Sequence, residues 1–367
     1  MSEPIPLSRP AIGPAEEELV LEVLRSGRLS LGPMLGRFEE ALGGFVGADH
    51  VSAVSSGTAG LHLATRAAGV QAGDEVITSP FSFVASANCL LYEDAKPVFA
   101  DVDPVTLNVD PAAVEAAVTE RTAGLLPVHI FGLAADMAAL ERIAEKAGLW
   151  IVEDACEAIG ASYSDGGLVG ARGHRAVFAF YPNKQLTTGE GGAVVCVDAQ
   201  DKARIDSERN QGRAPNMDWL DHDRLGFNYR MSDIGAALGL AQAERLATLL
   251  DQRAAAAALY NDALANLELT LPSDAPRSWF VYVVQVPAGV DRDDVIVKLG
   301  QQGIATKPYL PAIHLMSFYK ERFGWREGQF PVCEDISARS LALPFFGGIT
   351  ESQVSRVAEA LAQLLPS

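Results

Sequence analysis

The sequence predicts an α/β fold, with a large domain built on a mainly parallel β-sheet and a smaller C-terminal α/β domain. Over the first two thirds of the 367 residues, short apolar runs alternate with helical stretches. The alternation stops after Met231, and a shorter α/β pattern follows a helical connector. We therefore expect residues 1–245 to form the large domain, and residues 246–367 to form the connecting helix and the small domain.

The expected strands of the large domain are short runs of β-branched and other apolar residues. They span residues 50–56, 75–78, 96–102, 124–131, 149–153, 176–180 and 191–197. Helical stretches separate many of them; one example is residues 136–148, where apolar side chains recur at helical spacing and Gly148 is a stop signal. Because a parallel sheet binds ligands at the carboxyl ends of its strands, functional residues are expected there.

The C-terminal third opens with an Ala- and Leu-rich stretch that reaches about Leu267 without a proline. This stretch is long enough for one connecting helix, straight or kinked. A smaller unit is expected beyond it, with strands over residues 277–286 and 304–309 and helices over residues 293–303 and 351–364.

The charge balance excludes some classes of partner. Lys and Arg total 29 and Asp and Glu total 47, which gives a formal net charge of −18 with His neutral. A body this acidic repels polyanions, so nucleic acids and anionic membranes are disfavoured as main partners. An anionic ligand would need a locally organised pocket.

Targeting and metal-binding signals are not found in the sequence. The N-terminal residues have neither a basic run before an apolar core nor a cleavage site, and no segment approaches the ~18 uninterrupted apolar residues of a membrane span. The cysteines at positions 89, 156, 196 and 333 lack metal-ligand spacing. We expect no metal site, and reduced thiols in a cytoplasmic protein.

The first candidate site is a turn at the end of the expected strand 50–56. Neither GxGxxG nor GxxxxGK[ST] follows a strand, which disfavours ordinary dinucleotide and P-loop sites. Instead the chain reads Ser56-Gly57-Thr58-Ala59 and then becomes helical. The free N–H groups of the helix N-terminus, together with the Thr58 hydroxyl, can hold a phosphate. The alternative is an ordinary helix cap.

Two further candidates follow later strands. Asp154 ends the apolar run 149–153, where a buried carboxylate needs a cationic partner; its alternative is a helix N-cap. Lys184 lies in the loop between two apolar strands and precedes a Thr- and Gly-rich turn; its alternative is a solvated surface charge. A phosphate turn, a strand-end Asp and a later Lys are the parts that pyridoxal 5′-phosphate (PLP) needs.

The chain also resembles a known family over about residues 5–365. The resemblance rests on PLSRPAIG, VSSGTAGLHLA, GDEVITSPFSFVASAN, AKPVFADVDP, PVHIFG, VEDACEAIGA, FAFYPNKQLTTGEGGAVV, DRLGFNYRMSDIGAALGLAQ and RSLALPFF. These stretches closely resemble the DegT/DnrJ/StrS family of PLP-dependent sugar aminotransferases. The resemblance implies PLP-dependent transferase fold type I and a homodimer with active sites at the subunit interface.

Carried over position by position, the resemblance assigns roles to the three candidate motifs. Lys184 resembles the Schiff-base lysine and Asp154 the partner of the pyridine nitrogen. Gly57, Thr58 and Ala59 resemble the turn that binds the cofactor phosphate.

Four further positions are implied by the resemblance alone. Phe83 falls where the family places an aromatic residue against the cofactor ring, and Glu157 where a side chain lies near the ring oxygen. Asn228 resembles an asparagine that reaches the phosphate of the neighbouring subunit. His314 resembles a substrate-side residue of some members. The alternatives are a core Phe, a turn Asn and a surface His.

The sequence departs from the family pattern at two positions. Many members carry Ser five residues before the lysine as a phosphate ligand, and here that position is Ala179. Phosphate binding is therefore expected to depend on Thr58, backbone groups and other side chains. Glu157 stands where others have Gln or His, which resembles the branch acting on 4-keto-6-deoxyhexoses.

The implied activity is transfer of an amino group from glutamate to the keto group of a nucleotide-linked sugar. Three alternatives remain. A sugar dehydratase of the same scaffold would replace Lys184 with His, and a catalytically silent PLP-binding regulatory protein would not need the pair Lys184 and Asp154. A nicotinamide dehydrogenase would need the glycine fingerprint that the sequence lacks.

Overall fold

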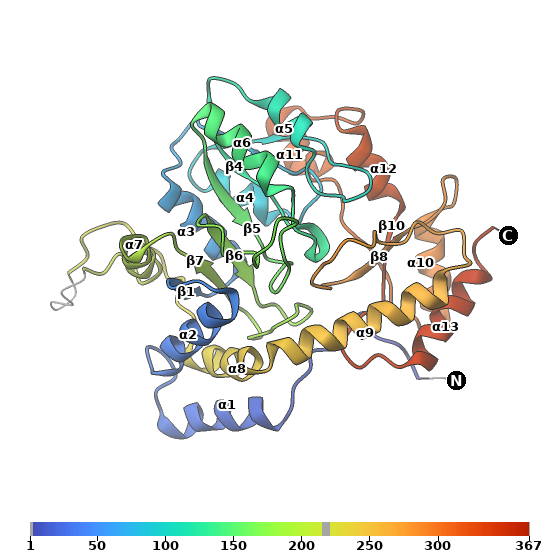
Figure 1. The fold of residues 1–367 in the computed structure, drawn as a ribbon, viewed down its shortest axis with the longest axis horizontal. Coiled ribbons are helices and arrows are strands. Elements are labelled where there is room, and N and C mark those ends of the chain that lie inside the picture. The colour runs from blue at the N-terminus through green and yellow to red at the C-terminus, as the bar shows by residue number, and fades with distance from the viewer. Residues whose placement is uncertain (1–2, 215–220, 367) are drawn as a thin grey trace.

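A computed structural model describes residues 3–214 and 221–366 (Figure 1). It contains a seven-stranded sheet over residues 51–195 and a three-stranded sheet in the C-terminal third. The predicted α/β fold, with a mainly parallel sheet and a smaller C-terminal α/β unit, is confirmed. The division at residues 1–245 and 246–367 stays a prediction.

The large sheet has the strand order β1-β7-β6-β5-β4-β2-β3. Its strands are β1 (Val51–Val54), β2 (Glu75–Thr78), β3 (Lys96–Phe99), β4 (Thr122–Leu126), β5 (Trp150–Asp154), β6 (Arg175–Ala179) and β7 (Gly192–Val195). All neighbours pair in parallel except β7, which is antiparallel to both β1 and β6. Because an antiparallel return needs no crossover helix, the loop from β6 to β7 stays at the carboxyl edge of the parallel strands.

Helices cover both faces of this sheet, because alternate strand residues point to opposite sides. Val152 of β5 packs into the core under α3 (Gly57–Ala68), α4 (Ala85–Leu91) and α7 (Ala199–Arg209). Its neighbour Ile151 packs into the opposite core, which contains residues of α1 (Pro14–Ser26), α2 (Met34–Val46), α5 (Pro111–Ala117), α6 (Met137–Ala147) and α8 (Asp233–Glu244). The site is therefore carried by strands that are fixed from both sides.

The expected connecting helix is two helices that meet at Arg245. α8 ends at Glu244, and α9 (Leu246–Leu264) continues toward the small sheet, as Figure 1 shows. Arg245 donates hydrogen bonds to Glu16 of α1 and to the Ala11 carbonyl oxygen, which anchors the junction to the N-terminal segment. Of the straight and kinked connecting helices that the sequence allowed, the structure shows the kinked one.

The small sheet has the order β8-β10-β9 and is antiparallel throughout. Its strands are β8 (Tyr282–Gln285), β9 (Lys307–Pro308) and β10 (Ser340–Leu343), and its helices are α10 (Arg292–Gln301), α11 (Ser317–Phe323), α12 (Pro331–Arg339) and α13 (Glu351–Ala362). The strands expected over residues 277–286 and 304–309 are much shorter in the structure. The central strand β10 was not expected from the sequence.

Both termini of the described chain belong to this smaller unit. Ile5 packs in the core of the small sheet and pairs with Ile304, and Arg356 of α13 donates a hydrogen bond to the Glu3 carbonyl oxygen. The marked N and C ends accordingly lie on the same side in Figure 1. Of the helices in the described ranges, none is long and apolar enough to cross a membrane.

Candidate active site

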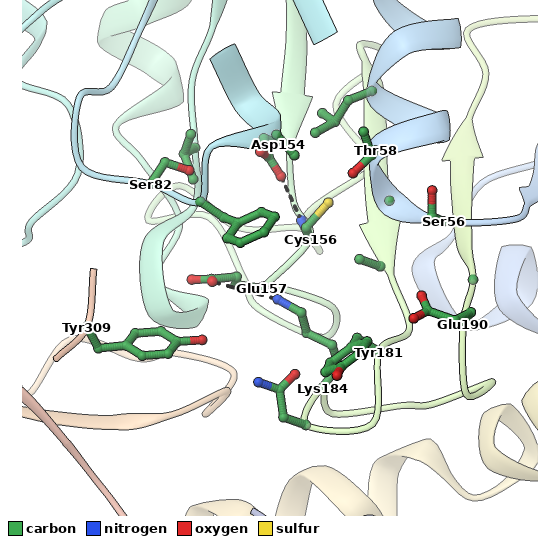
Figure 2. A pocket seen from close by; sticks show the side chains of 18 residues that line it. Ser56, Thr58, Ser82, Asp154, Cys156, Glu157, Tyr181, Lys184, Glu190 and Tyr309 are labelled. Atoms are coloured by element: carbon green, nitrogen blue, oxygen red, sulfur yellow. Dashed lines mark hydrogen bonds and ion pairs between the residues drawn. The ribbon is translucent and has the colours of Figure 1, made fainter. Parts of the chain in front are cut away.

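A cavity of about 480 Å³ opens at the carboxyl ends of β1, β5 and β6 (Figure 2). Its size falls in the range of ordinary small-molecule sites. The small domain contributes Tyr309 to its wall. The other lining residues come from the large sheet and its loops: Ser56, Gly57, Thr58, Leu61, Ser82, Phe83, Ala85, Val128, Asp154, Cys156, Glu157, Ala179, Tyr181, Asn183, Lys184, Glu190 and Gly191.

The N-terminus of α3 lies at one end of the cavity. Ser56 is its N-cap, and its hydroxyl accepts a hydrogen bond from Ala59 N at 3.1 Å. Because the first N–H groups of a helix have no intrahelical acceptor, those of Gly57 and Thr58 stay available where both residues line the cavity. The predicted turn is therefore both a helix cap and a candidate anion site. Ala59 does not line the cavity, and its N–H is used by the cap.

Only glycine fits at position 57. A Cβ there would lie 2.7 Å from the Ala179 Cβ and 3.1 Å from the Cys156 Sγ. The helix terminus consequently packs directly on the end of β6. Ala179, the position where the family pattern has Ser, forms this contact instead of offering a hydroxyl.

Asp154 is the last residue of β5 and is only 4 % exposed. Its Oδ2 accepts a hydrogen bond from Ser86 Oγ at 2.6 Å, and its Oδ1 accepts one from Cys156 N at 3.1 Å. Turns rather than a helix follow β5, so the N-cap alternative is wrong. No ion pair to Asp154 occurs within residues 3–214 and 221–366. A buried carboxylate of this kind is stabilised by a cationic ligand group.

Lys184 lies in the loop between β6 and β7, and its side chain is only 13 % exposed. Its Nζ lies 3.7 Å from Glu157 Oε1 and 3.9 Å from the centroid of the Phe280 ring. Figure 2 shows the amine pointing into the cavity toward Glu157. The alternative of a solvated surface lysine is wrong.

Glu157 is buried at the base of the cavity. Its Oε2 accepts a hydrogen bond from Phe131 N at 2.9 Å. Burial raises the pKa of Glu157, while the nearby Lys184 amine acts in the opposite direction. Glu157 therefore holds a proton more readily than an exposed glutamate does.

Aromatic side chains supply apolar walls. Phe83 is 61 % exposed and lines the cavity, so the alternative of a core phenylalanine is wrong. Tyr181 is also exposed at the cavity. Burial, followed by the charge of nearby Glu157, raises the pKa of Tyr309, so its hydroxyl stays protonated at neutral pH.

Two predicted residues lie outside this cavity. Asn228 is exposed and pairs through the backbone with Asn210. His314 is 0 % exposed, and its Nε2 lies 2.9 Å from Glu334 Oε1. The alternative of a surface histidine is therefore wrong, and the structure does not bring His314 to the cavity.

Sequence reasoning missed Ser86, Phe280 and Tyr309. Ser86 falls within a stretch that carried the family resemblance, but nothing in that stretch marked its contact with Asp154. Phe280 and Tyr309 reach the site from the small domain, and no local sequence pattern indicates such long-range contacts.

The residues present fit PLP. A helix N-terminus with free N–H groups suits its phosphate, and the buried carboxylate of Asp154 suits a protonated pyridine nitrogen. The amine of Lys184 points into the same cavity, beside Glu157. No cluster of three or more metal-ligating side chains occurs in the parts of the chain that the structure describes.

Comparison with known proteins agrees with this geometry. The chain is 38 % identical to the spore coat polysaccharide biosynthesis protein SpsC of Bacillus subtilis (strain 168), over 98 % of this chain and 97 % of that protein. Its fold matches S. venezuelae DesV, solved in complex with a ketimine intermediate, with a TM-score of 0.91 and 33 % identity over 99 % and 98 % of the two chains.

A second solved structure matches equally well. Spr1654 from Streptococcus pneumoniae, in its PLP form, has a TM-score of 0.93 and 26 % identity over 98 % of each chain. The fold is that of PLP-dependent transferase fold type I. The model of the DegT/DnrJ/EryC1/StrS aminotransferase family matches residues 10–362. The chain therefore belongs to the DegT/DnrJ/EryC1/StrS aminotransferase family and is a sugar aminotransferase.

Proposed function

We propose that this enzyme uses PLP to move an amino group from glutamate to the keto group of a nucleotide-linked 4-keto-6-deoxyhexose. The observation that carries the proposal is the meeting of Lys184, Asp154 and the N-terminus of α3 in one cavity. The similarity to a polysaccharide biosynthesis protein supports amino-sugar production for a polysaccharide.

Lys184 is the base in this proposal. When bound, PLP supplies an electrophilic aldehyde carbon and a ring that accepts electrons from the reacting carbon. The Lys184 Nζ would hold PLP at that carbon. As a free amine, Nζ would act as the base that takes up the proton of the donor α-carbon. The same movements in reverse order aminate the sugar ketone.

Asp154 keeps the ring nitrogen protonated. Its carboxylate accepts hydrogen bonds from Ser86 Oγ and Cys156 N. The Ser86 Oγ in turn lies 2.7 Å from the Ser82 Oγ. A fixed, buried carboxylate favours the cationic ring much more than an exposed one would. Asp154 would thereby stabilise the negative charge that develops during the reaction.

Glu157 and Phe83 orient the ring. Phe83 presents an exposed aromatic surface at the cavity, suited to packing against a flat heterocycle. Glu157, whose pKa is raised by burial, can share a proton with the ring oxygen. The phosphate is held by Thr58 and by the N–H groups of the first turn of α3.

We further propose a cytoplasmic homodimer with shared active sites. Asn228 is exposed between Phe227 and Tyr229, whose rings stack with centroids 5.0 Å apart. Phe227 and Tyr229 both contact His62 of α3, which leaves Asn228 free to reach the phosphate site of a second subunit. The cysteines are free thiols, as expected of a protein in a reducing compartment.

The direct test is incubation with glutamate, PLP and a panel of keto-sugar nucleotides. We expect 2-oxoglutarate and an amino sugar by mass spectrometry, and neither product from Lys184→Ala. A sugar dehydratase would instead form a deoxygenated sugar that carries no new amino group. A silent regulatory protein would show no change in the cofactor absorption band on adding glutamate. Either of these outcomes would contradict the proposal.

A further inference from the structure

Arg253 is a buried arginine of α9 that the proposed mechanism does not use. It is 5 % exposed, and burial lowers its pKa to about 10, so it remains a cation at neutral pH. No carboxylate forms an ion pair with it in the parts of the chain that the structure describes. Since a buried cation is costly without partners, its surroundings must compensate.

Four carbonyl oxygens provide that compensation. Nη2 of Arg253 donates to Lys184 O at 2.8 Å and to Asn183 O at 3.2 Å. Nη1 donates to Phe280 O at 3.0 Å and to Trp279 O at 3.5 Å. One guanidinium therefore ties the loop that carries Lys184 to the segment that carries Phe280.

These two anchored residues are themselves in contact at the active site. The Lys184 Nζ lies 3.9 Å from the centroid of the Phe280 ring, which is a cation–π distance. The main chains of both partners are thus fixed by the same side chain. The planar guanidinium has two terminal nitrogens, which can donate hydrogen bonds to the carbonyl oxygens of both segments at once. A lysine would offer a single nitrogen.

We propose that Arg253 is a positioning residue for Lys184, which holds the catalytic amine over the Phe280 ring by fixing both main chains. This inference rests on the proposed role of Lys184. A residue that the reaction depends on would then lie in the connecting helix α9, outside the cavity.

Other contacts hold the same two segments without Arg253. Gln185 Nε2 donates to Ser278 Oγ at 3.0 Å, and Ser278 N donates to Gly132 O at 2.9 Å. A variant at position 253 therefore keeps the segment docked. Its expected effect is local, on the freedom of the Lys184 side chain.

The test is competitive labelling of lysines in the apoenzyme by reductive methylation, read by peptide mass spectrometry. Lys146, which is 77 % exposed, is the internal standard. We expect Arg253→Met to raise the labelling rate of Lys184 relative to Lys146 by about fivefold to tenfold, since a released side chain is more often exposed. Arg253→Lys should give a smaller increase.

Arg245→Met is the matched control. Arg245 lies just before α9 and bonds to a carboxylate and a carbonyl, but contacts neither segment. We expect the relative rate at Lys184 to stay unchanged in this variant. Circular dichroism checks folding, and if Arg253→Met does not fold, Arg253→Lys decides the question.

An unchanged Lys184 rate in a folded position-253 variant would overturn the inference. An equal increase in Arg245→Met would also overturn it. The measurement needs no cofactor, so it remains independent of the proposed activity. Attachment of PLP to a different lysine would overturn the proposed activity and leave the labelling result standing.

Discussion

Two carboxylates near Lys184 have opposite surroundings. Asp154 accepts hydrogen bonds from Ser86 and Cys156, whereas burial raises the pKa of Glu157. Two acids in such different surroundings can divide two tasks. In the proposed mechanism Asp154 pairs with the ring nitrogen and Glu157 exchanges a proton.

We expect Asp154→Asn to lower the rate of the glutamate half-reaction by about 10²–10³-fold, because the ring loses its fixed counter-charge. The fold should be retained. The amide oxygen can accept from Cys156 N, and the Ser86 hydroxyl can donate to Phe83 O, 3.1 Å away. Single-turnover absorbance measures the rate. Asp165→Asn, an exposed control, should react normally, and a near-normal rate in Asp154→Asn would contradict the electrostatic role.

Glu157 predicts a pH dependence of apoenzyme stability. Its folded-state pKa lies above its ordinary value of 4.5, so between these values the folded protein holds a proton that the unfolded chain has lost. Stability therefore falls as the pH rises through this window. Glu157→Gln can still accept from Phe131 N but cannot titrate. We expect its Tm, relative to the parent protein, to increase from pH 4.5 to pH 8.

Glu334→Gln is the control of opposite sign. Burial raises the pKa of Glu334, but hydrogen bonds from Gly328, Phe330 and His314 outweigh it and leave the pKa lowered. The contribution of Glu334 to stability is present above pH 4.5 and is lost as the pH falls. Its variant should lose relative Tm on going from pH 4.5 to pH 8. The same trend in both variants would show that Glu157 is not the group responsible.

At this scale the sequence could place residues that directly follow strands. Asp154 ends β5, and Lys184 lies in the loop after β6, so local pattern and parallel-sheet geometry sufficed. Phe280 and Arg253 could not be placed, since their contacts with Lys184 arise only when α9 and the small domain pack against that loop. His314 lies outside the cavity and contacts Glu334, and no local signal in the sequence indicated this contact.

Among the elements, the return from β6 to β7 is the one that builds the site. β7 is antiparallel, so the loop of residues 180–191 crosses the edge where β5 and β1 end. The sequence predicted both strands but not this direction, because an apolar run is the same for either orientation. The sequence analysis also missed β10, because its four residues are too short a run to show a strand pattern.

The segment 226–230 carries Asn228, which is proposed to serve the second subunit. Phe227 stacks on Tyr229 and packs against His62 and Arg66 of α3, so its ring fixes the position of Asn228. We expect Phe227→Ala to weaken PLP binding about tenfold, roughly 1.4 kcal/mol, by loosening Asn228. Equilibrium dialysis measures the affinity. Phe318→Ala, an exposed aromatic truncation elsewhere, should bind normally, and unchanged affinity in Phe227→Ala would remove the segment from the site.

At the scale of the whole molecule, the proposed site shared between two subunits predicts complementation between them. Mixed Lys184→Ala and Asn228→Ala chains form heterodimers in which one site has its own lysine and the partner's asparagine. With random exchange, about a quarter of the sites should regain activity. Activity after mixing, against each variant alone, measures this fraction.

The matched control is a mixture of Lys184→Ala and Asp154→Asn. Both residues line the same cavity of one chain, so neither site of that heterodimer is complete. No recovery is expected here. Recovery in both mixtures, or in neither despite confirmed exchange, would mean that Asn228 does not serve the second subunit.

Attachment of the cofactor to Lys184 is the central claim, and borohydride reduction tests it most directly. The PLP-loaded enzyme is reduced and digested, and the modified peptide is identified by mass spectrometry. We predict a covalent adduct on Lys184 alone, which disappears when glutamate is added before reduction. An adduct on another lysine, or an adduct that glutamate does not remove, would contradict the account.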